Sequence, residues 1–195
     1  MAIFKQYKGV GKMFRRYWDA YGGMSAIISS PYLHAAFLFT LLMTGTCLTP
    51  GWWEQVISVM PNLTGFTLGG FAIIVTFGDD DFKKVVYTKF DEEEHSFVAT
   101  IGATFVHFVL LQVLSLILAL ASKSTFFVLN EHSRAYQALQ VCTSDVTQLL
   151  VVCRSFWWFI SYGIFLYALL TTIAATFAIF RLVYNYQSYL DTKED

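Results

Sequence analysis

Residues 62–82, NLTGFTLGGFAIIVTFGDDDF, decide how the chain folds, because an uncharged apolar run ends there abruptly in three aspartates. The apolar part, residues 63–77, would rise about 22 Å as a helix, which is short of the ~30 Å hydrocarbon core of a bilayer. We therefore expect the helix to draw on residues before Pro61 or to lie in a thinned or protein-lined region. Small residues allow helices to approach closely inside membranes. The sequence predicts such helix packing at Gly65, Gly69 and Gly70.

Composition places the whole chain in the membrane class. Of its 195 residues, 56% are hydrophobic and 18% aromatic, while only 14% are charged. Soluble domains carry about 25% charged residues. The formal net charge of −1 provides no basic field for nucleic acid, so no direct binding of DNA or RNA is expected.

The sequence predicts an all-α membrane protein with four transmembrane helices. The predicted spans are residues 32–48, 61–78, 96–121 and 155–180, inside a helical domain of residues 26–190 that is followed by a short tail, 191–195. With the N-terminus inside, ten of the 13 lysines and arginines fall on the inner side. The positive-inside rule then makes both termini of this multi-pass membrane protein cytoplasmic.

Aromatic and sulfur-bearing side chains are expected near the outer side of the membrane. Trp52 and Trp53 are typical of an outer interface belt. The three cysteines, Cys47, Cys142 and Cys153, also lie at or near the outer side, and their spacing leaves open whether any two form a disulfide.

Residues 1–25 form a basic amphipathic segment whose cations are interleaved with aromatic residues. Such a helix suits the inner membrane interface, where its cations meet anionic lipid. A topology signal that merely flanks the first span is the plainer interpretation. The expected membrane-surface basic patch consists of Lys5, Lys8, Lys12, Arg15 and Arg16.

Residues 79–95, DDDFKKVVYTKFDEEEH, have the opposite charge and are predicted on the same side of the membrane. They fit either a solvated exit loop or a docking surface for a cytoplasmic partner. Acid clusters are also found at calcium sites, but the EF-hand pattern is missing, and no metal is predicted. The expected docking residues are Asp79, Asp80, Asp81, Lys83, Lys84, Asp91, Glu92, Glu93 and Glu94.

The third predicted span carries a thin polar stripe, which consists of Thr100, Thr104, His107 and Ser115. His107 falls near mid-membrane, where an unpaired polar group is costly, so we expect it to face other helices. The stripe fits interhelical hydrogen bonds, a proton-responsive element, or the lining of a pore in an oligomer. Gln112 lies off this line.

The sequence contains no recognisable catalytic motif. Nucleotide-binding glycine loops, zinc-protease and serine-hydrolase motifs, and paired CxxC motifs are missing, and the four histidines are scattered. We therefore expect a protein that is not an enzyme and needs no cofactor.

Part of the sequence also resembles a known family of proteins. The segments Pro61-Asn62-Leu63, Gly65-Phe66, Leu68-Gly69-Gly70 and Phe77-Gly78-Asp79 resemble a stretch of small bacterial four-helix membrane proteins from antiphage islands. The overall plan is similar to the membrane subunit of the Kiwa defence system. This resemblance implies a homo-oligomer, a tetramer in that family, which works with a cytoplasmic DNA-binding subunit after infection is sensed at the envelope. It carries over no active-site residues.

The residues and the resemblance together give one hypothesis and its alternatives. A disturbance of the membrane would repack the helices and change the charged cytoplasmic surfaces, so that a soluble partner is released or activated. The alternatives are a pore-forming effector that depolarises the inner membrane through the polar stripe, or a small channel or transporter.

Overall fold

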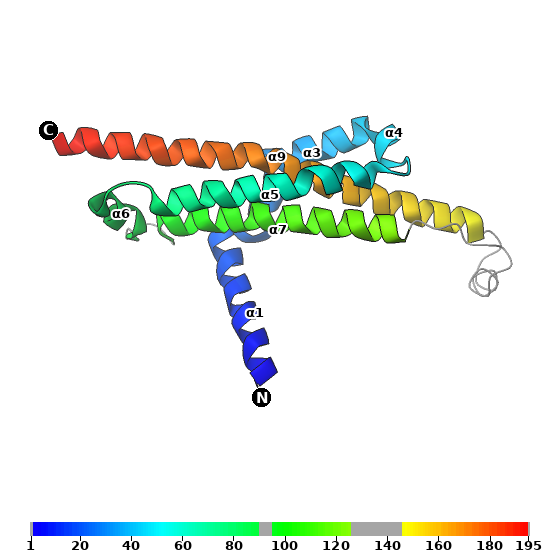
Figure 1. The fold of residues 1–195 in the computed structure, drawn as a ribbon, viewed down its shortest axis with the longest axis horizontal. Helices are drawn as coiled ribbons and strands as arrows, with labels where there is room; N and C mark the ends of the chain where they lie inside the picture. The colour runs from blue at the N-terminus through cyan, green and yellow to red at the C-terminus, as the bar shows by residue number, and fades with distance from the viewer. Residues whose placement is uncertain (1, 90–94, 126–145, 195) are drawn as a thin grey trace.

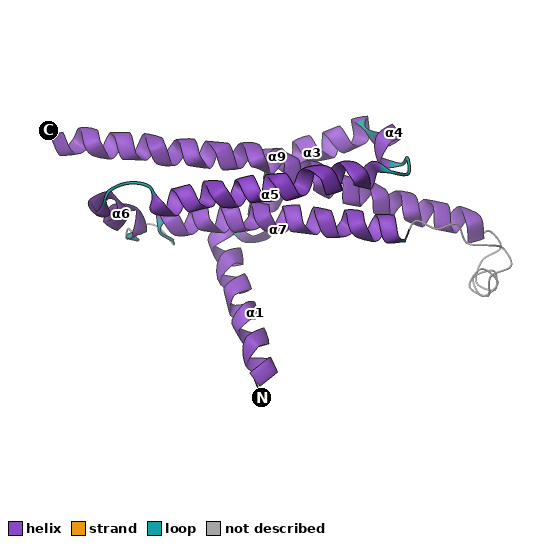
Figure 2. Cartoon of the chain, viewed as in Figure 1, coloured by secondary structure: helices purple, strands orange, loops and turns teal. Residues whose placement is uncertain are grey.

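The computed structural model describes residues 2–89, 95–125 and 146–194, and every secondary-structure element in these ranges is a helix (Figure 2). The helices are α1 (Ala2–Tyr21), α2 (Gly23–Ile28), α3 (Pro31–Leu42), α4 (Thr44–Cys47), α5 (Trp52–Thr76), α6 (Asp80–Tyr87), α7 (Phe97–Ser124) and α9 (Val146–Glu194). The predicted all-α fold class is confirmed for this part of the chain.

Three helices form the body of the molecule. α5, α7 and α9 pack side by side, with α3 against α9, while α1 leaves the side of this bundle (Figure 1). Within the described ranges, the helices long and apolar enough to cross a membrane are Trp52–Thr76, Phe97–Ser124 and the Gln148–Lys193 part of α9. Large apolar side chains remain exposed on all three, including Phe66, Ile117 and Phe177, as expected for surfaces that face lipid.

The first predicted span, residues 32–48, is helical but interrupted. α3 has 12 residues, so it rises about 18 Å, and the chain departs from helical geometry at Met43 before the four residues of α4. α3 alone is therefore shorter than a bilayer core, and a fourth crossing stays a prediction.

α5, which covers residues 61–76 of the second predicted span (61–78), begins nine residues before Pro61, at Trp52. Proline removes one backbone hydrogen bond but does not end the helix, a tolerance usual in membrane helices because neighbouring groups satisfy the freed carbonyl. The 25 residues rise about 37 Å, which is ample for a span. The expectation that this helix draws on residues before Pro61 is thus met.

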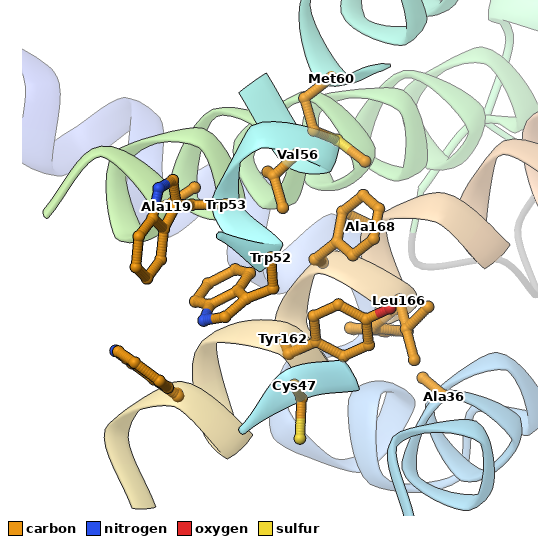
Figure 3. Close-up of a cluster of buried hydrophobic side chains, with 13 residues drawn as sticks. Ala36, Cys47, Trp52, Trp53, Val56, Met60, Ala119, Tyr162, Leu166 and Ala168 are labelled. Carbon is orange, nitrogen blue, oxygen red and sulfur yellow. The ribbon is translucent and has the colours of Figure 1, made fainter. Parts of the chain in front are cut away.

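A hydrophobic core joins the start of α5 to α9 and to α4 (Figure 3). Trp52 and Trp53 are 3% and 6% exposed and pack edge-on against Tyr162 and Trp158 of α9. The interface belt predicted for these two tryptophans is therefore wrong, since their rings pack inside the protein. Cys47, which belongs to the same core, is a free thiol.

A second core lies toward the other end of the bundle. There Phe82 and Val86 of α6 and Phe105 of α7 pack with Leu182 of α9. This core fixes the short helix α6 against the C-terminal part of α9. It thereby positions the acidic residues that follow α5.

Candidate functional site

His107 of α7 is the point at which the N-terminal helix joins the bundle. Its side chain is buried, and Nδ1 lies 2.7 Å from the hydroxyl oxygen of Tyr17 in α1. The Tyr21 ring stacks on the imidazole at a centroid distance of 4.0 Å. On the other side, Nε2 lies 3.4 Å from the hydroxyl oxygen of Tyr167 in α9. One histidine thus contacts α1 and α9 at the same time, and we call these four residues the arm junction.

The arm junction has a consistent hydrogen-bond scheme. Burial raises the pKa of the Tyr17 phenol, with the nearby Tyr167 as a second cause, so Tyr17 stays protonated and can donate to Nδ1. A neutral imidazole then carries its proton on Nε2, from which it donates toward Tyr167. Both ring nitrogens of His107 are therefore engaged.

The sequence of α1 prepares this contact. Its cations recur on one face, whereas Phe14, Tyr17, Trp18 and Tyr21 lie toward the other, at the three- and four-residue steps of a helix. The Phe14 ring stacks on Trp18 at 6.2 Å, and Tyr17 contacts Tyr21 at 6.1 Å. The aromatic face thus meets α7 while the basic face remains exposed.

Two glycines make the corner that turns the chain from α1 into α2. Gly22 has φ +97° and Gly23 has φ +65°, a left-handed region that other residues rarely adopt. α1 therefore ends at Tyr21 and stands away from the bundle, as Figure 1 shows. We call it the N-terminal arm.

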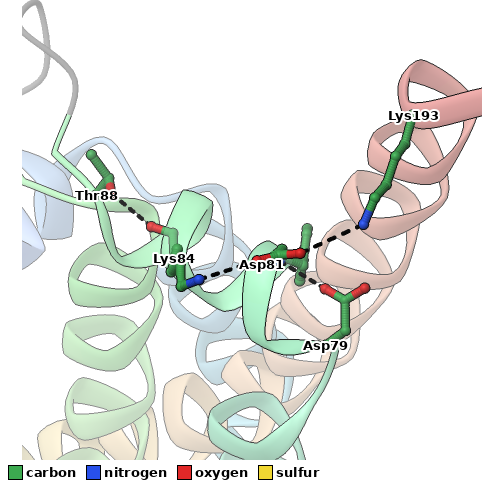
Figure 4. A network of polar contacts seen from close by, with 6 residues as sticks. Asp79, Asp81, Lys84, Thr88 and Lys193 are labelled. Carbon is green, nitrogen blue, oxygen red and sulfur yellow. Dashed lines mark hydrogen bonds and ion pairs between the residues drawn. The ribbon is translucent and has the colours of Figure 1, made fainter. Parts of the chain in front are cut away.

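The acidic residues after α5 form the N-terminal end of α6 (Figure 4). The Asp79 carboxylate accepts a hydrogen bond of 2.8 Å from the backbone N–H of Phe82, which makes Asp79 the N-cap of α6. Gly78, at φ +85°, precedes it, and a Cβ there would lie 2.5 Å from the Phe82 ring. Only glycine suits this position.

α6 is held on α9 by aromatic packing and by the ion pair between Asp81 and Lys193. The centroid of the Phe82 ring lies 4.8 Å from the ring centroid of Tyr186 and 5.4 Å from that of Tyr189. The Asp81 carboxylate pairs with Lys84 at 3.1 Å and with Lys193 of α9 at 3.7 Å. The hydrogen bond from Lys84, together with the charges of both lysines, lowers the pKa of Asp81.

These contacts give the predicted docking residues different roles. Asp79 is a helix cap and Asp81 an ion-pair partner, whereas Asp80 and Lys83 make no polar contact with other described side chains. Asp91, Glu92, Glu93 and Glu94 lie outside the described residues. We use the name acidic helix face for the carboxylates of Asp79, Asp80 and Asp81.

The basic patch of the arm is separate from the acidic helix face. Lys8, Lys12, Arg15 and Arg16 are exposed on α1, and the side chain of Lys5 lies outside the described set. Across residues 6–89, no ion pair joins these cations to α6. The two charged segments are thus presented as distinct surfaces.

The predicted polar stripe does not form one surface. His107 and Ser115 are buried, while Thr100 is exposed and Thr104 half-buried. The hydroxyls of Thr100 and Thr104 donate to carbonyls four residues earlier in their own segment. Gln112, off the stripe, instead donates a buried hydrogen bond of 2.9 Å to Thr67 of α5.

The three glycines of α5, for which the sequence predicts helix packing, differ in their surroundings. A Cβ at Gly70 would lie 3.2 Å from Ile179 of α9, so this glycine sits at a close helix contact. Gly65 and Gly69 are exposed, and a Cβ on either would meet nothing within 4 Å.

Sequence reasoning missed the tyrosine partners of His107. Tyr17 and Tyr21 were recognised as an aromatic face, but nothing in their spacing indicates which helix they meet.

Comparison of the chain with models of known protein families, with curated proteins and with solved structures finds no match.

Proposed function

We propose that this protein is a membrane-embedded coupling subunit that transmits a change in its helix bundle to charged cytoplasmic surfaces and thereby holds or activates a soluble partner. The observation that supports this function is the arm junction. A single buried histidine bonds to Tyr17 of the basic arm and to Tyr167 of the longest helix. Any shift of α7 against α9 therefore changes the hydrogen bonds of His107, and with them the contact that holds the arm on the bundle.

The same long helix also contacts α6, which bears the acidic helix face. Lys193, Tyr186 and Tyr189 of α9 contact α6, while Tyr167, about 30 Å away along a straight helix, contacts His107. Movement of α9 would consequently alter the acidic helix face and the arm together. Two packings that differ by a few kcal/mol suffice for such a switch.

On the resemblance to the Kiwa membrane subunit, the biological setting would be antiphage defence in a bacterial inner membrane. The soluble partner would then be a DNA-binding protein, and the trigger a disturbance of the envelope during infection.

The test compares phage protection and partner retention in one set of cells. The chain is expressed with the product of the gene beside it, and plaque numbers and the co-purified neighbour are measured. The variant Asp79→Ser, Asp80→Asn removes two charges but keeps a capping side chain at position 79. We expect an equal amount of membrane protein, less bound neighbour and weaker protection. Unchanged binding and protection would refute the role of the acidic helix face.

The pore alternative makes a different prediction. It requires the polar stripe to line a conduit, whereas His107 and Ser115 are covered inside the single chain. Purified protein in liposomes discriminates between the two classes. Ion flux that falls in His107→Leu would favour the pore, and silent liposomes favour the coupling subunit.

A further inference from the structure

One face of α5 has an unusual composition for a membrane span. Residues at alternating steps of three and four along the helix are all exposed, and we call them the outer seam: Gln55, Ser58, Asn62, Gly65, Gly69, Ala72 and Thr76. At about 100° per residue, this seam lies opposite the buried side of α5, to which Val56, Met60 and Ile74 belong. The side of the helix farthest from the core is thus small or polar throughout.

Lipid alone does not account for this pattern. Larger apolar side chains flank the seam, with Phe66 66% exposed, Ile73 55% and Leu68 51%. The small and polar side chains of the seam therefore lie between bulkier apolar side chains. Gly65 and Gly69 have no close packing partner among the described residues, because an added Cβ on either would meet none of their atoms within 4 Å. Small residues in this arrangement are those that let a second backbone approach.

A polar group in the middle of the seam supplies an independent reason for a protein partner. Asn62 is ten residues from the start of α5, which places it about 15 Å along the helix. Within the described part of the chain, its amide makes one long contact, 3.4 Å from Nδ2 to the carbonyl oxygen of Ser58. Polar groups that face hydrocarbon without partners are costly.

We propose that the outer seam of α5 packs in parallel against the outer seam of α5 in a second copy of this chain, with the two Asn62 amides hydrogen-bonded to each other. All copies insert into the membrane with the same topology. The outer seam of one copy therefore lies at the same membrane depth as the outer seam of another. An amide both donates and accepts, and is therefore complementary to itself. The 3.5-residue repeat corresponds to a left-handed crossing of the two helices.

This interface is independent of the proposed coupling function. It assigns Gly65 and Gly69 to contacts between copies, while Gly70 packs within one copy.

Cysteine crosslinking in membranes tests the geometry directly. In a cysteine-free background, single cysteines are placed at Ser58, Asn62 and Gly65 in the seam and at Val59 and Phe66 beside it. All five positions are exposed, so exposure alone predicts equal reaction. We expect oxidation to give covalent dimers at the seam positions and few at the flanking ones. Equal crosslinking at all five, or none, would overturn the proposal and leave lipid or another protein as the occupant.

Energy transfer between labelled copies diluted in liposomes tests the amide. Asn62→Leu should weaken self-association about 3- to 30-fold, the range of measured hydrogen bonds between membrane helices, while Asn62→Gln retains most of it. Circular dichroism checks that both variants keep their helix content. A dimer fraction in Asn62→Leu equal to that of the unchanged protein would refute the amide pairing.

Discussion

Replacing His107 by phenylalanine should release the N-terminal arm from the bundle while retaining the ring stacking with Tyr21. Phenylalanine keeps a ring that can stack on Tyr21, now 4.0 Å away, but it loses the 2.7 Å hydrogen bond with Tyr17 and the 3.4 Å contact with Tyr167. An unsatisfied buried hydroxyl costs about 1–3 kcal/mol. The equilibrium between released and docked arm should therefore shift about 5- to 150-fold toward release.

Pulsed electron paramagnetic resonance between spin labels measures this shift. Labels at Lys12 on the arm and Leu114 on α7 occupy exposed positions, so neither disturbs a packed contact. We expect a single short distance in the unchanged protein and an added, broader population in His107→Phe. His107→Leu should release the arm further, because the loss of an aromatic pair costs about 0.5–1.5 kcal/mol more.

Tyr17→Phe is the matched control. It removes the same hydrogen bond from the other side and leaves the His107 ring in place, so it should release the arm by a similar or smaller amount. If all three variants keep the distance distribution of the unchanged protein, the arm junction does not position the arm, and the proposed coupling loses its support.

Three further predictions concern α6 and the hydrogen bond between α5 and α7. Gly78→Ala should detach α6, because its φ of +85° and a Cβ 2.5 Å from Phe82 cost about 1–3 kcal/mol, and amide hydrogen exchange in α6 should rise. Thr67→Val should lower thermal stability in detergent more than the double variant with Gln112→Leu, since the single change leaves the buried Gln112 amide without its acceptor, whereas in Gln112→Leu the Thr67 hydroxyl still donates to the carbonyl of Leu63. The pKa of Asp81 is lowered in the folded state, so its ion pairs stabilise α6 above the unfolded pKa of ~3.9 and that stabilisation is lost as pH falls through the lower folded value. The protection of α6 amides, measured relative to their intrinsic exchange rate at each pH, should thus decrease in acid, and Asp81→Asn should reduce this pH dependence.

Several features of the fold could be read from the chain itself. The uncharged run of residues 96–121 predicted a span, and α7 covers Phe97–Ser124, because an apolar segment of that length has few alternatives to a membrane helix. The glycine and aspartates at positions 78–81 likewise predicted the abrupt end of α5, which stops at Thr76.

The direction in which side chains point was decided by tertiary packing. Trp52 and Trp53 have the composition of an interface belt, yet α9 offers them a core, and burying two large rings there is more favourable than exposing them. In the same way, spacing groups His107 with Thr100, but only the arm brings Tyr17 and Tyr21 against the histidine.

The sequence by itself determined a helical chain with membrane-length apolar segments, a basic aromatic N-terminus and an acidic exit from α5. These properties depend on local periodicity and on total hydrophobicity, which are fixed by the residues alone. Only the tertiary structure decided that Gly70 faces the core while Gly65 and Gly69 face outward, and that one histidine connects the arm to α9. Those outcomes depend on which helix faces which, and pairing between distant segments is not encoded in the spacing of either segment.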